Sequence, residues 1–433
     1  MIRRALLLAS MFVCMTASAG ELRVDIAEDY DDHLFALFKH LHANPELSMQ
    51  EFKTSDRMAK EFEDAGYKVT RGVGKTGLVG MLRNGDGPTL MIRADMDGLP
   101  VLELTGLEYA SRVRQVNLEG IEMPVMHACG HDMHMTTLIG VARRMAGMKG
   151  QWSGTLMLVA QPAEEAEGGA KAMVADGIYE RIGRPDFALA QHIWPTNPVG
   201  TISFSDGLMF SSNDTVEIVV RGVGTHGASP HLGKDPVYIG SQIVIALQSI
   251  VTRDISPTEP ALITVGAFHA GTAPNVIADT ARLDITVRAN TEETRYYLLE
   301  AIERVAVNTA RAAGIPEELL PRVIVREDGA PTTTNDAALA RRVRAAMEAG
   351  MPADAFVEFK QLDMGSEDFP DLVNVDPPIP SVYFVVGGTP PDRLANGDWA
   401  ETHSGLFRLE PRGSVTAGVE AMTLAALELL RPR

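Results

Sequence analysis

The sequence predicts an α/β fold with a largely buried central sheet, and two observations lead to that class. Short apolar runs bounded by glycine or proline alternate along the chain with longer segments of helical spacing. Continuous apolar runs are typical of strands covered by helices on both faces. With 433 residues, of which 45% are hydrophobic, the chain is long enough for two or three domains with sizeable cores.

The elements of the main domain follow from these two patterns. Two amphipathic helices are expected between Asp25 and Lys68, around a turn at residues 42–45. The apolar runs predict strands at 78–82, 89–93, 155–161, 187–192 and 381–386. Helical spacing predicts helices at 132–147, 168–177, 335–349 and 414–430.

A different pattern of apolar and polar residues in the middle of the chain predicts a second, inserted α+β domain. Thr215–Arg221 alternates between apolar and polar residues, as a half-exposed strand does. The elements after it are a helix, two strands, a long helix and a short strand, which gives the order β-α-β-β-α-β. The predicted boundaries are 20–210 for the first part of the catalytic domain, 211–329 for the insertion and 330–433 for the second part.

The first 19 residues are typical of an export signal. Arg3 and Arg4 precede an apolar run, and small residues end the segment at Ala19, where cleavage is expected. A membrane anchor is the alternative, but the run is too short to span a bilayer. We therefore expect a periplasmic or secreted protein with no membrane span after processing.

Charge and cysteine content narrow the function. The net charge of −18 argues against nucleic acid and anionic membrane surfaces as partners. Of the two cysteines, Cys14 leaves with the signal and Cys129 remains, so no internal disulfide can form. The thiol of Cys129 lies between histidines in an exported protein, and we therefore expect it to be bound by a partner and not free.

Metal-binding residue types gather just after the predicted strands. The strand ends are followed by Asp95 and Asp97, by Glu164 and Glu165, by His192 and, after a longer loop, by His403. Ligands of open α/β sheets bind at this edge, and the loop with Cys129 and His131 is expected to reach it. An extended backbone at Cys129-Gly130-His131 would point both side chains the same way.

Thiolate, imidazole and carboxylate groups are ligands of zinc, manganese or cobalt. The candidate residues supply more ligands than one tetrahedral ion with an open position can use. They suit two divalent ions that activate water for hydrolysis. One of the paired glutamates could bind metal while the other serves as general base, and spacing alone does not decide between them. The alternative without any metal chemistry is that the two glutamates lie in solvent at the N-terminus of a helix, where acidic side chains interact favourably with the helix dipole.

Cys129 has two other interpretations. A papain-like nucleophile needs a histidine and usually an asparagine, which leaves both glutamates and the additional histidines without a role. A structural cysteine in the core fits poorly, because Gly130 and Asp132 break the apolar pattern there.

Seven motifs together resemble a family of di-metal amidohydrolases of the aminoacylase/carboxypeptidase type, in the branch of hippurate hydrolases and indole-acetyl-amino-acid hydrolases. The motifs are HANPELS, MHACGHDMH, QPAEE, QHIWP, HGASPH, NVIAD and MGSEDF. The resemblance runs from about Asp25 to the C-terminus. It implies a phosphorylase/hydrolase-like catalytic domain with a central mixed sheet, and an inserted domain that serves as lid and homodimer interface.

The resemblance also implies roles for single residues. Glu164 corresponds to the general base, and His226 to a histidine that steadies the oxyanion from across the dimer. Asn275 and Arg288 match positions that hold the substrate. The implied metal ligands are Cys129 as the bridging residue, His131, Glu165, His192 and His403.

The function expected from the sequence is metal-dependent hydrolysis of the amide bond of small N-acyl or N-aroyl amino acids. A metal-bridging water, deprotonated toward Glu164, would attack the amide carbon. The alternatives are a metallo-dipeptidase or carboxypeptidase, and a non-catalytic periplasmic protein that binds metal or ligand.

Overall fold

The computed structural model describes residues 20–432, so the predicted signal at 1–19 lies outside the described residues. The strands are β1 Lys68–Val73, β2 Gly77–Asn84, β3 Thr89–Asp95, β4 Arg114–Val116, β5 Glu122–Pro124, β6 Gly154–Gln161, β7 Phe187–Pro198, β8 Ile202–Ser203, β9 Leu208–Phe210, β10 Asp214–Arg221, β11 Thr225–His226, β12 Ala261–Ala270, β13 Val276–Ile277, β14 Thr280–Ala289, β15 Arg322–Val325, β16 Thr333–Thr334 and β17 Ser381–Thr389. The helices are 20–29, continued by a π turn at Tyr30–Leu34, then α2 Phe35–Ala43, α3 Phe52–Asp64, α4 His131–Gly147, α5 Gly169–Ala175, α6 Ile178–Ile182, α7 Pro236–Ser249, α8 Glu292–Ala312, α9 Ala337–Gly350, α10 Phe369–Val373, α11 Pro391–Asn396 and α12 Pro411–Leu429.

The chain divides into two compact units. The first comprises the described residues up to Met209, residues 334–360 and the chain from Asp371 onward. The second comprises Phe210–Thr333 and Gln361–Pro370. The short segment 361–370, which the sequence-based boundaries put in the catalytic domain, therefore belongs to the second unit.

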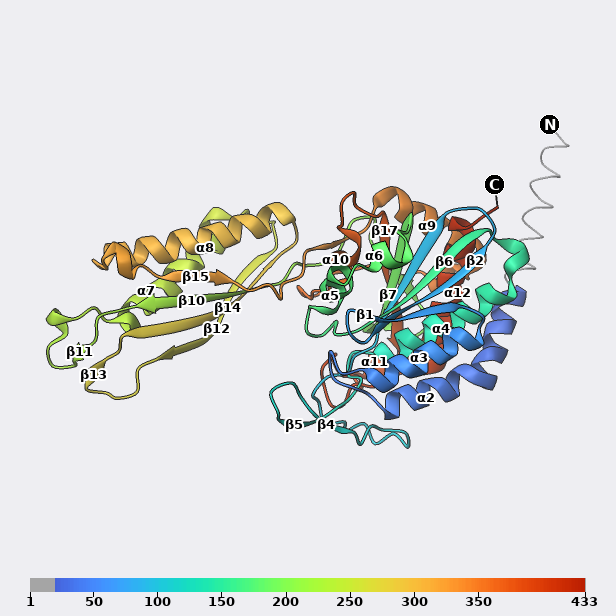
Figure 1. Ribbon diagram of the computed structural model, residues 1–433, viewed down its shortest axis with the longest axis horizontal. Helices are drawn as coiled ribbons and strands as arrows, with labels where there is room; N and C mark the ends of the chain where they lie inside the picture. The colour runs from blue at the N-terminus through green and yellow to red at the C-terminus, as the bar shows by residue number, and fades with distance from the viewer. Residues whose placement is uncertain (1–19, 433) are drawn as a thin grey trace. The chain divides into compact units, whose positions relative to one another are not determined.

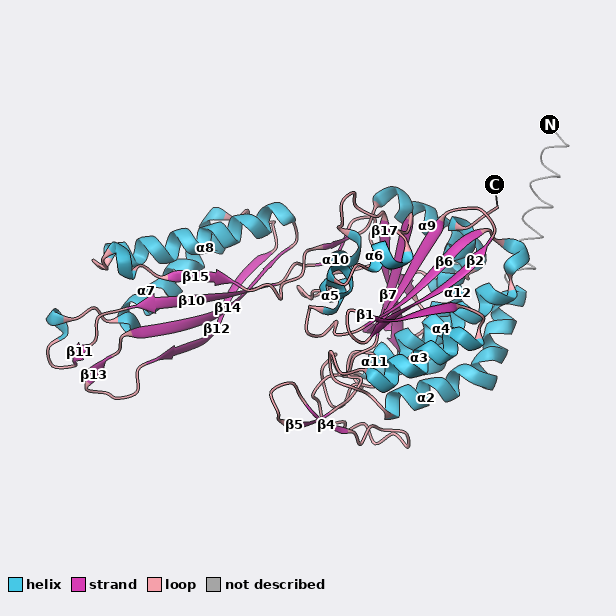
Figure 2. Ribbon diagram, in the orientation of Figure 1, coloured by secondary structure: helices cyan, strands magenta, loops and turns pink. Residues whose placement is uncertain are grey.

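The first unit is built on a seven-stranded mixed sheet in the order β1-β2-β6-β3-β7-β17-β8 (Figures 1 and 2). Strands β6, β3, β7 and β17 run parallel to one another, while β1, β2 and β8 pair antiparallel with their neighbours. This confirms the predicted α/β class and the central mixed sheet. Because the four central strands are parallel, their carboxyl ends lie at one edge of the sheet.

Helices α4 and α12 pack against each other and against the sheet, α4 on β3 and α12 on β17. Gly140 permits their close approach, because a Cβ there would lie 2.5 Å from a methyl carbon of Val419. The packing fixes α4, whose first residue is His131, against the strands that lead to the same edge. Among residues 20–432, no helix is long and apolar enough to cross a bilayer.

The second unit is an antiparallel four-stranded sheet, in the order β12-β14-β10-β15, with two helices. Its elements follow one another as β10, α7, β12, β14, α8 and β15. Alternate residues of β10 and β14 point into a core with apolar residues of α7 and α8. A separate ribbon of β11 and β13 carries His226 (Figure 1).

Candidate metal centre

The structure brings five predicted ligand residues together at one edge of the first unit. Cys129 Sγ lies 3.3 Å from His192 Nε2, and these two residues form a possible ligand group with His131. The apolar pattern suggested that His192 lies just after a strand. In the structure β7 continues to Pro198, so His192 lies inside the strand. All three side chains are buried.

The Cys-Gly-His turn has a different backbone from the extended one expected from its spacing. Gly130 has a φ of +93° in the left-handed region, and α4 begins at the next residue. A residue with a Cβ would be strained there, whereas glycine is not. The tight turn thus places Cys129 just before the helix and His131 in its first turn.

A second ligand group shares Cys129 with the first. Glu165 and His403 complete this group, and their Oε2 and Nε2 atoms are 3.3 Å apart. His403 has a φ of +65°, and its amide donates to the carbonyl of Ala128 at 2.8 Å. Its side chain is 54% exposed, which makes it the open side of an otherwise buried cluster.

The paired glutamates both face His131. Its Nε2 atom lies 3.7 Å from Glu165 Oε1 and 3.8 Å from Glu164 Oε2. Each of the three residues offers one atom to a third possible ligand group. Glu164 thus lies within reach of the metal ligands, while its neighbour Glu165 also belongs to the group with Cys129 and His403.

Two buried atoms test whether this cluster fits a metal. His131 Nε2 and Glu165 Oε1 are both buried, and neither has a hydrogen-bond partner. Buried polar atoms are normally paired, so two unpaired ones facing each other call for a partner between them. Sulfur, nitrogen and oxygen donors at this spacing fit a transition-series divalent cation.

The electrostatics of the cluster favour a cation. Burial, with the charges of Glu165 and Glu164, raises the pKa of the Cys129 thiol well above its usual range. Burial also raises the pKa of Glu165 to about 7. Burial lowers the pKa of His131, but Asp95 and Asp97 outweigh it and raise the value to about 10. These shifts favour the protonated forms of the three groups, and a bound metal would oppose them because it binds thiolate, carboxylate and neutral imidazole.

Asp97 orients both a histidine and the glutamate pair. Its backbone carbonyl accepts a hydrogen bond from His131 Nδ1 at 2.9 Å, which turns Nε2 toward the glutamates. Its carboxylate accepts the amides of Glu164 and Glu165, each at 3.1 Å, and the hydroxyl of Ser48 at 2.6 Å. Asp97 therefore orients a ligand histidine and holds the backbone of both glutamates.

A second buried chain of hydrogen bonds supports His192. His134 Nδ1 lies 2.7 Å from Asp95 Oδ1, and His134 Nε2 accepts the amide of Ile193 at 2.9 Å. His192 Nδ1 in turn donates to the carbonyl of Ile193 at 2.8 Å, which leaves Nε2 facing Cys129. The sequence left His134 unassigned, although its place three residues after His131 puts both on one face of α4.

The other two unassigned histidines, His42 and His127, are buried nearby. His42 lies between Asp132 and Glu103, 2.6 Å and 3.1 Å from their oxygens. Burial lowers the pKa of His42, but these two carboxylates raise it to about 10. Burial lowers the pKa of His127 to about 4, so it is neutral. Neither residue belongs to a possible ligand group among the described residues.

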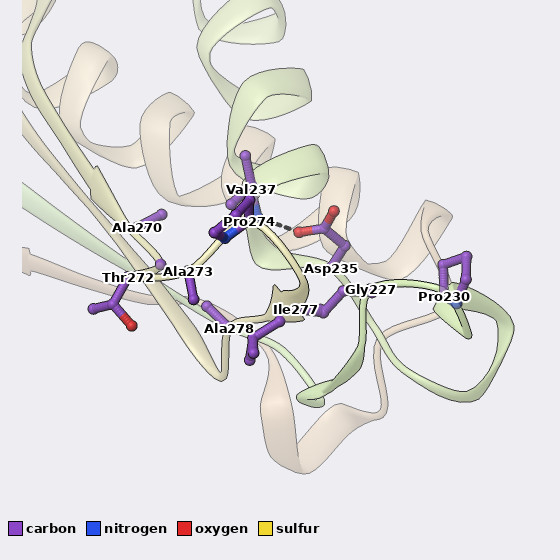
Figure 3. A pocket seen from close by; sticks show the side chains of 12 residues that line it. Gly227, Pro230, Asp235, Val237, Ala270, Thr272, Ala273, Pro274, Ile277 and Ala278 are labelled. Carbon is purple, nitrogen blue, oxygen red and sulfur yellow. Dashed lines mark hydrogen bonds between the residues drawn. The ribbon is translucent and has the colours of Figure 1, made fainter.

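The remaining predicted site residues lie in the second unit. His226 is exposed in β11, and the carbonyl of Asn275 accepts the amide of the adjacent Gly227 at 2.7 Å. A pocket of about 560 Å³ lies beside this ribbon, with Asp235, Pro274 and Ile277 among its lining residues (Figure 3). Arg288, near the end of β14, donates to the carbonyl of Met364 and the hydroxyl of Ser366, at 2.7 Å and 3.2 Å. The second unit thus places His226 and Asn275 together, and Arg288 at the 361–370 segment.

The sequence and the fold of this chain are similar to those of several known proteins. A family model described as Peptidase family M20/M25/M40 matches residues 91–404. A hippurate hydrolase of Campylobacter jejuni is 38% identical over 304 residues, 70% of this chain and 75% of the relative. Thermostable carboxypeptidase 2 of Saccharolobus solfataricus is 34% identical over 371 residues, 85% of this chain and 88% of the relative. A Bacillus subtilis structure, described as a dinuclear metal binding peptidase of family M20, is 28% identical with a TM-score of 0.75, and the match covers 93% of this chain and 99% of that one.

Proposed function

The chain belongs to the Peptidase family M20/M25/M40 and is a metal-dependent amidohydrolase, and on that premise we propose that it hydrolyses the amide bond of N-acyl or N-aroyl amino acids. The observation that carries the proposal is the pair of ligand groups that share Cys129, with Glu164 beside them. A pair of adjoining groups suits two ions, and a carboxylate next to them suits proton transfer.

Five residues of the first unit would hold two divalent ions, with Cys129 shared between them. His131 and His192 would complete one group, and Glu165 and His403 the other. When bound there, the ions would polarise the substrate carbonyl and lower the pKa of water. The mixed donor set is compatible with zinc, manganese or cobalt.

Glu164 is the residue proposed to move the proton. Its amide is fixed by Asp97, and its carboxylate lies 3.8 Å from His131 Nε2. From there it can accept a proton from the attacking water and deliver it to the nitrogen of the leaving amine, which balances the hydrolysis. For the substrate itself, Asn275 and Arg288 are proposed to hold the carbonyl and the carboxylate.

Apolar residues beside the open ligand support an acyl substrate. The amide of Leu104 donates to the carbonyl of Gly405 at 2.6 Å, which joins its loop to the loop of His403. Leu102, Leu104 and Leu406 are all more than half exposed there. Exposed leucines at the rim of a site favour an apolar acyl or aroyl group over the charged ammonium of a dipeptide.

A substrate panel tests this preference. We expect a higher kcat/KM for benzoyl- and other apolar acyl-amino acids than for unblocked dipeptides of the same C-terminal residue. Leu104→Ser is expected to narrow the difference, whereas Val24→Ser, at an exposed apolar position on the first helix, leaves it unchanged. Activity on dipeptides alone would support the dipeptidase or carboxypeptidase alternative, and bound metal without any turnover would support a metal or ligand receptor.

We also propose a homodimer formed through the second unit, in which His226 acts in the partner's site. Strand β12 is an edge of the four-stranded sheet, and Tyr238 and Ile245 on α7 are exposed. An unpaired edge next to apolar side chains is a surface that a second copy can cover symmetrically.

Complementation between two inactive variants tests this arrangement. Glu164→Gln and His226→Ala, each inactive or nearly so, are expected to recover about a quarter of wild-type activity when co-expressed in equal amounts, because half of the dimers are mixed and each has one intact site. No recovery in mixed dimers, isolated with two affinity tags, would mean that His226 acts within its own chain.

Export is proposed from the first 19 residues, which have the charge and apolar pattern of a signal. The mature protein would then begin at Gly20 and act in the periplasm or outside the cell.

A further inference from the structure

A hydrogen bond from a backbone amide to a buried carboxylate links the segment at residues 46–51, which begins inside the HANPELS motif, to the loop of the glutamate pair. Glu51 precedes the first residue of α3, yet its side chain caps no amide of that helix. The side chain is instead completely buried. Its Oε1 atom accepts the amides of Met49 at 2.9 Å and Ala163 at 2.8 Å, and Oε2 accepts the hydroxyl of Thr76 at 2.5 Å.

The amide that Glu51 holds belongs to a strained position. Ala163 has a φ of +48°, in the left-handed region that residues with a Cβ rarely adopt. It is completely buried and directly precedes Glu164. Such a conformation persists only where the surroundings hold it. Here the amide of Ala163 donates to Glu51, and its carbonyl accepts the amide of Gly169 at 3.1 Å.

Two buried carboxylates together hold three successive amides. Glu51 accepts the amide of Ala163, and Asp97 accepts those of Glu164 and Glu165. The direction of the loop as it leaves β6 is therefore set on both sides. Asp97 does not hold the peptide between Pro162 and Ala163, whose N–H loses its acceptor when Glu51 is replaced. The next peptide is held by Asp97 and by the amide of Gly169, which donates to the Ala163 carbonyl at 3.1 Å.

We propose that Glu51 is a positioning residue that sets the loop of Glu164 and Glu165 through the amide of Ala163. The expected loss of kcat rests on the proposed function. The expected loss of metal binding by Glu165 does not. Loss of the carboxylate leaves a buried amide without an acceptor and releases the left-handed residue. Both glutamate side chains then move away from His131.

The hydrogen bonds of Glu51 suggest a conservative variant that should keep the loop in place. A glutamine at position 51 can accept both amides with its single oxygen and can donate to Thr76, so the three hydrogen bonds are retained. An alanine retains none. If Glu51 acts by holding the loop, Glu51→Gln should behave like the wild-type protein and Glu51→Ala should not.

Glu46 provides a matched control in the same segment. It is also buried, and its carboxylate accepts the amide and hydroxyl of Thr54, at 2.8 Å and 3.0 Å. These contacts lie at the start of α3 and not at the loop of Ala163. Glu46→Ala therefore removes a buried carboxylate from the segment without releasing the loop.

The experiment measures Zn²⁺ affinity by competition with a chromogenic chelator, together with kcat and KM for benzoylglycine at saturating metal. Glu51→Ala is expected to weaken Zn²⁺ binding about tenfold, as changes behind metal ligands do. It should lower kcat about 10- to 100-fold with KM little changed, since a displacement of about 1 Å can cost that much. Glu51→Gln should restore both quantities, and Glu46→Ala should lower only the melting temperature.

Three outcomes would overturn the proposal. These are wild-type kcat and metal affinity in Glu51→Ala, equal losses in Glu51→Gln and Glu51→Ala, or the same losses in Glu46→Ala. If Glu51→Ala does not fold, Thr76→Val removes one of the three contacts and is expected to cause a several-fold loss of kcat in the same assays. If the wild-type protein hydrolyses no amide, the proposed function fails, and the Zn²⁺ affinities still decide the role of Glu51.

Discussion

Glu164→Gln is expected to lower kcat by about 10²- to 10⁴-fold while the protein still binds its metal ions. Glutamine has the same shape, and the amide at position 164 keeps its hydrogen bond to Asp97. What it loses is the ability to take a proton from water and return it to the leaving amine. The check is kcat on a benzoyl-amino acid together with metal content by elemental analysis.

The neighbouring residue gives the contrast for this variant. Glu165→Gln should lose metal as well as activity, because Glu165 shares a ligand group with Cys129 and lies 3.3 Å from His403. Undiminished turnover in Glu164→Gln would exclude Glu164 as the general base. Loss of metal from both variants would instead make both glutamates ligands.

Removal of metal is expected to abolish hydrolysis, and about two ions per chain should restore it. Cys129, His131, Glu165, His192 and His403 gather sulfur, nitrogen and oxygen donors within two overlapping groups. Dialysis against a chelator, followed by titration with Zn²⁺, Mn²⁺ or Co²⁺, measures both stoichiometry and activity. Mg²⁺, which prefers an all-oxygen shell, serves as the control and should not restore activity.

A metal-free protein with full activity would contradict this prediction and would point to Cys129 as a nucleophile. The buried thiol makes that outcome unfavourable, because its raised pKa leaves little thiolate near neutral pH when no cation is bound. Cys129→Ser, tested after reconstitution, would separate the loss of a metal ligand from the loss of a nucleophile.

Much of the fold could be predicted because burial leaves a strong pattern in sequence. Strands β3, β6 and β17 are almost wholly buried, β2 and β7 are buried over most of the part that was predicted, and each of the five contains an apolar run. Strand β1 was missed because Lys68–Val73 is mostly exposed, and its sequence lacks both an apolar run and regular alternation. The full length of β7 was missed because its last residues include two prolines and an asparagine.

The site could be predicted in part for a similar reason. Cysteine, histidine and glutamate after apolar runs are conspicuous, and the parallel strands bring them to one edge. The supporting contacts were not predictable, because they join distant positions through ordinary residue types. Ser48 reaches Asp97 and Glu51 reaches Ala163 across more than forty and more than one hundred residues respectively. Only the folded chain shows that these polar residues hold the backbone and the carboxylate next to the glutamate pair.

The position of His403 also has a consequence for biosynthesis. The first ligand, Cys129, and the last, His403, are separated by the whole second unit and about half of the first. Helix α12, which packs on the helix that begins at His131, is made after all of them. A chain still emerging from the ribosome therefore cannot assemble both ligand groups. The group that contains His403 can bind its ion only when synthesis is nearly complete, so the ions available where folding finishes decide which metal this group carries.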